Sequence, residues 1–291
     1  MIAARKPEWL RVPLPTGEKW RRLSGLVERR GLHTVCDSAR CPNKAECWGG
    51  GTATFMILGG ACTRNCRFCA VPTARTGDAV NADEPRELAE AVAELGLRFA
   101  VLTSVDRDDL PDRGAGHFAA CVRAIKARNP GVGVEVLCPD YREGEIGTVL
   151  DSGIEVFAHN VETVPRLQKV RDARASWAAS MHTLELAAAD GRVLVKTSLL
   201  LGLGETEDEV SAAMDALRAI GVRSLVMGQY LRPTPAQLDV VEYLTPETFA
   251  RYADLARAKG FTAVASAPLA RTSWHAREGY AESREAAGGA R

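Results

Sequence analysis

Apolar and amphipathic segments alternate along this chain from residue 54 to residue 259. Each short apolar run predicts a β-strand, and the amphipathic stretch after it predicts an α-helix. Six such pairs follow one another, and a last apolar run, FTAVASAP (261–268), comes after them. Runs such as FAVLTS (99–104) have no polar alternation, which indicates parallel strands that are covered on both faces. We therefore predict an α/β fold with helices over 84–95, 117–127, 144–150, 176–189, 207–220 and 246–259.

The number of strand–helix pairs decides between barrel types. Six pairs are fewer than the eight of a complete TIM barrel. We expect a partial (β/α)6 TIM-like barrel at 51–265, with a doubly wound sheet as the alternative. An N-terminal extension (1–50) and a C-terminal segment with a polar tail (266–291) complete the predicted organisation. The carboxyl ends of the parallel strands then form one rim, where such folds place their active sites.

The composition narrows the functional class. Lys+Arg and Asp+Glu are balanced at 37 each, which argues against nucleic-acid binding. The sequence has no signal-peptide pattern and no run of about 20 apolar residues, so we expect a cytoplasmic protein that does not span a membrane. Six of the eight cysteines lie between residues 36 and 69, and Cys121 and Cys138 stand alone as expected core residues. Clustered thiols in a reducing compartment favour metal binding over disulfides.

Three of these cysteines directly follow the first predicted strand. Cys62, Cys66 and Cys69 have the spacing C-x3-C-x2-C. A structural zinc site, the alternative, usually needs a fourth Cys or His ligand. Three thiolates on a 4Fe–4S cluster leave one iron without a protein ligand. The spacing, with Phe68 before the last cysteine, resembles the signature of radical S-adenosylmethionine (SAM) enzymes. That resemblance implies a 4Fe–4S cluster whose open iron binds SAM and whose electron generates a 5′-deoxyadenosyl radical.

A second triplet, Cys36, Cys41 and Cys47, precedes the first predicted strand with the spacing C-x4-C-x5-C. His33 lies nearby, so a Cys3His zinc site is the alternative to a second cluster. CDSARCPNKAECW (36–48), VLTSVDRDDLPD (101–112) and VASAPLARTSWHA (264–276) together resemble the lipoyl synthase family. The resemblance extends over about residues 20–280. It implies that the second triplet holds an auxiliary 4Fe–4S cluster, with Ser273 as a further ligand in place of the second serine of the family's Arg-Ser-Ser-Tyr motif.

The resemblance also implies a reaction and its partners. Lipoyl synthases insert two sulfur atoms at C6 and C8 of an octanoyl group, and the auxiliary cluster is consumed as the sulfur source. The octanoyl group is carried by a lipoyl domain of 2-oxoacid dehydrogenase E2 subunits or by the glycine-cleavage H protein. A flavodoxin or ferredoxin is the expected electron donor, and an iron–sulfur carrier is expected to rebuild the auxiliary cluster.

Polar residues at the predicted strand ends are candidates for SAM contacts. Thr103, Ser104, Asn160 and Glu162 are expected to bind SAM beside Phe68. The alternative is that the first two cap the following loop and that 106–109 is a solvated turn. GLGE (202–205) lacks the Lys of a phosphate loop and predicts a tight turn near the adenosine. His159 is expected to be structural, and Gln229 and Arg232 are further rim candidates.

Departures from the family's motifs at two places leave the identity of the substrate undetermined by the resemblance. Thr272 and Trp274 replace Ser and Tyr of the family motif, and Thr-Ser (197–198) stands where Ser-Gly is usual. A related enzyme that adds sulfur to another acyl carrier is therefore one alternative, and a non-catalytic iron–sulfur electron carrier is another.

The basic run RLQKVRDAR (166–174) is either a solvated face or, with Arg171 and Arg174, a docking site for an acidic carrier protein.

Overall fold

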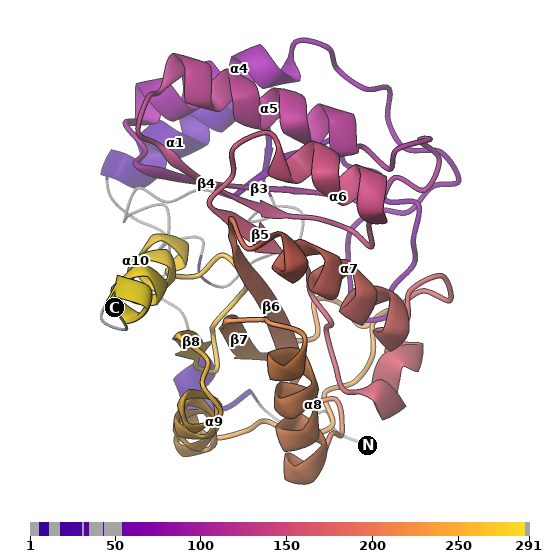
Figure 1. Ribbon diagram of the computed structural model, residues 1–291. Helices are drawn as coiled ribbons and strands as arrows, with labels where there is room; N and C mark the ends of the chain where they lie inside the picture. The colour runs from indigo at the N-terminus through magenta and orange to yellow at the C-terminus, as the bar shows by residue number, and fades with distance from the viewer. Residues whose placement is uncertain (1–5, 12–17, 31, 35–42, 44–53, 289–291) are drawn as a thin grey trace.

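The computed structural model describes residues 6–11, 18–30, 32–34, 43 and 54–288. Its centre is one curved sheet (Figure 1). The sheet has eight strands in the order β1 to β8. Strands β2 to β8 are parallel, and β1 pairs with β2 in the antiparallel direction. The strands are β1 (His33–Thr34), β2 (Thr54–Ile57), β3 (Phe99–Ser104), β4 (Gly133–Leu137), β5 (Val156–Ala158), β6 (Leu194–Leu201), β7 (Ser224–Gln229) and β8 (Ala263–Ser266).

The strand order confirms the partial barrel. A doubly wound sheet reverses its strand order at a switch point, whereas here every strand lies beside its neighbour in sequence. A helix follows each strand from β2 to β7, as the six predicted pairs require. These helices are α4 (Glu84–Leu95), α5 (Ala115–Arg128), α6 (Glu143–Leu150), α7 (Trp177–Asp190), α8 (Glu207–Ala219) and α9 (Pro246–Ala258).

The main core lies between the sheet and the surrounding helices. Leu102 of β3, Phe118 of α5 and Phe249 of α9 are among its fully buried side chains. Alternate residues of the strands face the inside of the barrel instead, which is the two-residue period of a strand. Phe99 and Val101 of β3 belong to this second, inner cluster. The two apolar layers explain the uninterrupted apolar runs of the sequence.

The segments outside the barrel pack on it at two places. Helix α1 (Glu18–Arg29) places Leu26 in the main core, and Arg30 bonds Glu87 and Glu90 of α4. Helix α10 (Ala276–Gly288) lies in the expected polar tail, contacts β8 and β3, and buries Ala276 against the inner cluster. A short 3-10 helix, η1 (Glu8–Leu10), lies near the N-terminus, and another, η2 (Pro165–Val170), follows β5. No helix of the described residues is long and apolar enough to cross a membrane.

Candidate active site at the carboxyl ends of the strands

The loop that carries the first cysteine triplet begins where β2 ends. Leu58 has a positive φ of 68°, and the following Gly59 has a φ of 87°, so the chain turns sharply out of the sheet. Glu84 at the start of α4 accepts a hydrogen bond from the Leu58 backbone N–H and also bonds His117. The strand end before the cysteine loop is therefore fixed by two helices.

The three thiols of this loop suit iron–sulfur ligation. Cys62, Cys66 and Cys69 are all partly exposed, and none forms a disulfide. The backbone N–H of Arg64 donates to Cys62 Sγ at 3.4 Å, and that of Asp172 donates to Cys66 Sγ at 3.3 Å. Hydrogen bonds to sulfur are the contacts with which proteins orient and tune iron–sulfur ligands.

Burial controls the charge of these thiols in the metal-free protein. It raises the pKa of Cys62 to about 11 and that of Cys66 to about 12, and it also raises the pKa of Cys69. The thiols are therefore protonated near neutral pH. A metal centre must displace these protons, because the thiolate is the ligand.

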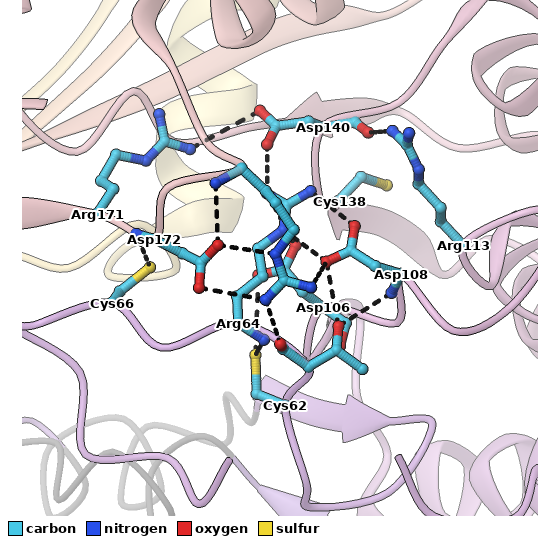
Figure 2. A network of polar contacts seen from close by, with 12 residues as sticks. Cys62, Arg64, Cys66, Asp106, Asp108, Arg113, Cys138, Asp140, Arg171 and Asp172 are labelled. Carbon is cyan, nitrogen blue, oxygen red and sulfur yellow. Dashed lines mark hydrogen bonds and ion pairs between the residues drawn. The ribbon is translucent and has the colours of Figure 1, made fainter. Parts of the chain in front are cut away.

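Arg64 anchors the cysteine loop to the neighbouring strand ends (Figure 2). Its side chain is 5% exposed and forms a two-point contact with Asp108 at 2.9 and 3.0 Å. It also pairs with Asp106 at 3.4 Å and with Asp140. Asp106 and Asp108 follow β3, and Asp140 follows β4. The alternative that residues 106–109 form a solvated turn is wrong, because their carboxylates bind buried arginines.

A cavity of about 140 Å³ lies beside the cysteine loop and brings most of the predicted SAM contacts together. It is bounded by the cysteine loop and by the ends of β3, β4 and β5. The predicted residues that line it are Cys66, Phe68, Thr103, Ser104, Asn160 and Glu162.

The polar residues of this cavity differ in how far they are already engaged. The Thr103 hydroxyl donates to the Leu137 carbonyl at 3.1 Å, which ties β3 to β4. Asn160 Nδ2 donates to Glu162 Oε1 at 3.1 Å, and burial raises the pKa of Glu162. Ser104 Oγ is buried and has no hydrogen-bond partner within the described part of the chain. A ligand with polar groups would satisfy it, since buried polar atoms without partners are rare.

His159 is structural, as predicted. Its Nδ1 lies 2.9 Å from the Cys138 carbonyl oxygen, and its Nε2 lies 2.8 Å from Ser180 Oγ. Cys138 and Cys121 are buried, which confirms them as core residues. The GLGE segment is the predicted tight turn, in which Glu205 accepts hydrogen bonds from the backbone of Gly202 and Leu203.

Two rim candidates and two docking candidates have other roles in the structure. Gln229 is completely buried and bonds the backbone on both sides of β7, so it is wrong as a rim contact. Arg232 pairs with Asp239 on the surface. Arg171 is wrong as a docking residue, because it is 8% exposed and lines the cavity. Arg174 bonds Asp172 and the Thr63 carbonyl, which supports the cysteine loop from outside.

The second triplet, Cys36, Cys41 and Cys47, lies outside the described residues, so its ligand role stays a prediction. Asn43, between the last two of these cysteines in the sequence, is described and buried. Its Nδ2 donates to the Leu269 carbonyl at 2.5 Å, four residues before the partly buried Ser273. The neighbouring Thr272 Oγ1 lies 3.1 Å from Asn160 Oδ1.

The anchoring role of Arg64 and its acidic partners was not predicted from the sequence. The signal was available in part, since an arginine between two cysteines lies on the cysteine loop and three aspartates follow two strand ends. What the sequence does not give is the distance between these segments, which are 44 and 76 residues apart.

Comparisons with known proteins agree with this geometry. The model of the radical SAM superfamily matches residues 56–217. A lipoyl synthase from Marinobacter nauticus is 52% identical over 276 residues, which cover 94% of this chain and 79% of that protein. Lipoyl synthases from Thermus thermophilus and Anaeromyxobacter dehalogenans are also 52% identical, over 94% of this chain and over 86% and 95% of those proteins.

Solved structures support the fold. Methylornithine synthase superposes with a TM-score of 0.59 at 15% identity, over 84% of this chain and 74% of that one. The FeFe-hydrogenase maturase from Carboxydothermus hydrogenoformans has a TM-score of 0.58 at 16% identity, over 80% of this chain and 57% of that one. At such identities the similarity concerns the partial barrel alone.

Proposed function

This chain belongs to the lipoyl synthase family of the radical SAM superfamily, and we propose that it inserts sulfur at C6 and C8 of an octanoyl group on a lipoyl carrier protein. The single observation that carries the proposal is the cavity between the cysteine loop and the ends of β3, β4 and β5. The fit of the donor groups to a cluster and to SAM supports it. Three thiols on one loop suit a 4Fe–4S cluster with an open iron.

The roles of the cavity residues follow from their chemistry. Cys62, Cys66 and Cys69 would hold the cluster, and Thr103, Ser104, Asn160 and Glu162 would position SAM beside Phe68. Ser104 Oγ supports this assignment because it is a buried hydroxyl without a partner in the described segments. When bound, the cluster and SAM supply a carbon-centred radical that removes hydrogen from an unactivated carbon. The chain positions the reactants and excludes side reactions.

An auxiliary 4Fe–4S cluster is the second part of the proposal. Cys36, Cys41 and Cys47 would hold it, with Ser273 as an oxygen ligand. The Asn43–Leu269 hydrogen bond supports this arrangement, because it joins the sequence of the second triplet to the segment that carries Ser273. A serine oxygen is a hard ligand, and it binds the iron of an iron–sulfur cluster less favourably than a soft thiolate does. Ser273 would therefore be released as the cluster gives up sulfur.

The proposed partners follow from this reaction. The substrate would be an octanoylated lipoyl domain of an E2 subunit or the glycine-cleavage H protein. A flavodoxin or ferredoxin would supply electrons, and an iron–sulfur carrier would rebuild the auxiliary cluster.

The test is anaerobic reconstitution of the chain with iron, sulfide, SAM, a reductant and an octanoylated lipoyl-domain peptide. We expect a product heavier by two sulfurs in its dithiol form, or by two sulfurs less two hydrogens in its disulfide form, together with 5′-deoxyadenosine. The matched control is Cys66→Ala, which should abolish both products. SAM cleavage without a sulfur-containing peptide would point to a different acyl carrier. Cluster reduction without SAM cleavage would point to an electron carrier.

A further inference from the structure

Asp140, in the turn after β4, is the residue at which the walls of the cavity meet. It is 5% exposed and lines the cavity. Its carboxylate pairs with Arg64 of the cysteine loop and lies 3.1 Å from His159 Nε2, just after β5. Ser180 Oγ of α7 donates to it at 3.1 Å. Three segments that are far apart in the sequence are therefore joined through one carboxylate.

A fourth contact extends this cluster towards η2. Arg171 Nη2 lies 3.7 Å from Asp140 Oδ1 (Figure 2). Arg171 Nη1 donates to Ser180 Oγ at 2.8 Å. Arg171 lines the cavity as well. On the backbone side, the Asp140 carbonyl accepts a hydrogen bond from Arg113. The position of Asp140 is thus fixed from the main chain and from the side chain.

The carboxylate is held in its ionised form. Burial by itself would raise the pKa of Asp140, but hydrogen bonding by His159 and the nearby charges of Arg171 and Arg64 hold it well below its ordinary range. Breaking a buried ion pair leaves uncompensated charge, which costs far more than losing a surface pair. Arg171, whose ion pair within the described residues is with Asp140, would be left in this position if the Asp140 charge were removed, whereas Arg64 would keep Asp106 and Asp108.

We propose that Asp140 is a positioning residue that couples the cysteine loop to the opposite cavity wall, so that the seating of the cluster and the affinity for SAM depend on each other. The inference rests on the proposed function. It assigns no contact between Asp140 and the reacting atoms. Its action is through Arg64 on one side and through His159 and Arg171 on the other.

Asp108 provides a matched comparison inside the same network. It also bonds Arg64, at 2.9 and 3.0 Å, and its side chain is 20% exposed. It is absent from the lining of the cavity and from the contacts of His159 and Arg171 within the described residues. Asp108 also bonds Thr63 and pairs with Arg174, so its contacts support the cysteine loop from one side, whereas those of Asp140 join the loop to the opposite cavity wall.

The experiment compares Asp140→Asn with Asp108→Asn in the anaerobic holoprotein. The readouts are the SAM dissociation constant, by equilibrium dialysis with labelled SAM, and the EPR spectrum of the reduced three-cysteine cluster. Hydrogen bonds to charged groups contribute enough to change an equilibrium constant about ten- to hundredfold. We expect Asp140→Asn to weaken SAM binding by about that factor and to change the EPR spectrum. Asp108→Asn leaves Arg64 paired with Asp106 and Asp140 and should change SAM binding by less than about threefold.

Equal effects of the two variants, or an unchanged SAM affinity in Asp140→Asn, would overturn the inference. If Asp140→Asn does not retain its cluster, the variant Ser180→Ala tests the coupling instead. It removes only the hydroxyl that bonds Asp140, His159 and Arg171, and we expect SAM affinity about three- to tenfold weaker at full cluster content. An unchanged affinity in Ser180→Ala contradicts the coupling. A wild-type protein that binds no SAM would instead reject the proposed function.

Discussion

Lys196 Nζ lies 2.9 Å from each carboxylate oxygen of Glu135, and both side chains are buried inside the barrel. Glu135 belongs to β4 and Lys196 to β6, so the pair spans the intervening β5. Neither residue lines the proposed SAM cavity. The pair therefore fixes the spacing of the strands whose ends form the site.

Removing one charge of this pair should destabilise the fold. We expect Glu135→Gln to lower the free energy of unfolding by about 3–5 kcal/mol, because it leaves the Lys196 ammonium buried without a counter-charge. The double variant Glu135→Leu/Lys196→Met should recover most of this loss, since an apolar pair of similar volume often replaces a buried ion pair without cost. Urea unfolding of the metal-free protein measures the free energy of unfolding of the single and the double variant. A loss below about 1 kcal/mol in the single variant would show that the pair is dispensable.

The turn after β6 depends on a glycine. Gly202 has a φ of 95°, and a Cβ there would lie 2.2 Å from Gln229 Nε2 and 2.4 Å from the Glu242 carbonyl oxygen. We expect Gly202→Ala to destabilise the protein by about 1–3 kcal/mol, because both the backbone conformation and the neighbouring side chain resist it.

The matched control for that substitution is Gly147→Ala. Gly147 lies inside α6, and a Cβ there would meet nothing within 4 Å. Alanine should stabilise the helix by about 0.5–1 kcal/mol. Thermal unfolding of the two variants should therefore move in opposite directions, and equal shifts would contradict the strain assigned to Gly202.

The link between the second triplet and the C-terminal segment can be tested separately. Asn43→Ala removes the hydrogen bond to the Leu269 carbonyl. We expect the variant to lose auxiliary-cluster content while retaining the cluster of the first triplet, measured by iron and sulfide analysis and by Mössbauer spectroscopy. Asn129→Ala is the control, because Asn129 makes the same kind of bond to the Ala89 carbonyl at 2.9 Å, between α5 and α4. Equal cluster loss in both variants would rule out a specific role for Asn43.

The sequence predicted local structure well because its signals are local. The helix predicted over 84–95 coincides with α4, and the strand order agrees with the predicted barrel. Helix α10 was expected to be a polar tail, since its buried residues are few and its partner, the inner cluster, is formed by distant strands.

Charge patterns in the sequence predicted the exposure of side chains less well than the apolar pattern predicted the helices and strands. The residue types of the basic run 166–174 predict one exposed basic surface. In the structure Arg171 is buried beside Asp140, whereas Lys169, two residues earlier, is exposed. The difference arises because η2 ends at Val170 and the chain then turns towards the cavity. Tertiary pairing of this kind cannot be obtained from residue type and spacing.

This difference changes the docking prediction for the carrier protein. Lys169 remains on the surface beside the cysteine loop, since Arg67 N donates to the Val170 carbonyl at 2.9 Å. We expect Lys169→Glu to weaken binding of an acidic lipoyl domain several-fold at low salt and to have little effect at high salt, where exposed charges are screened. Arg123→Glu, a charge reversal on the exposed surface of α5, is the control and should leave the affinity unchanged. Calorimetric titration at two salt concentrations measures this, and equal losses in the two variants would mean that only net charge matters.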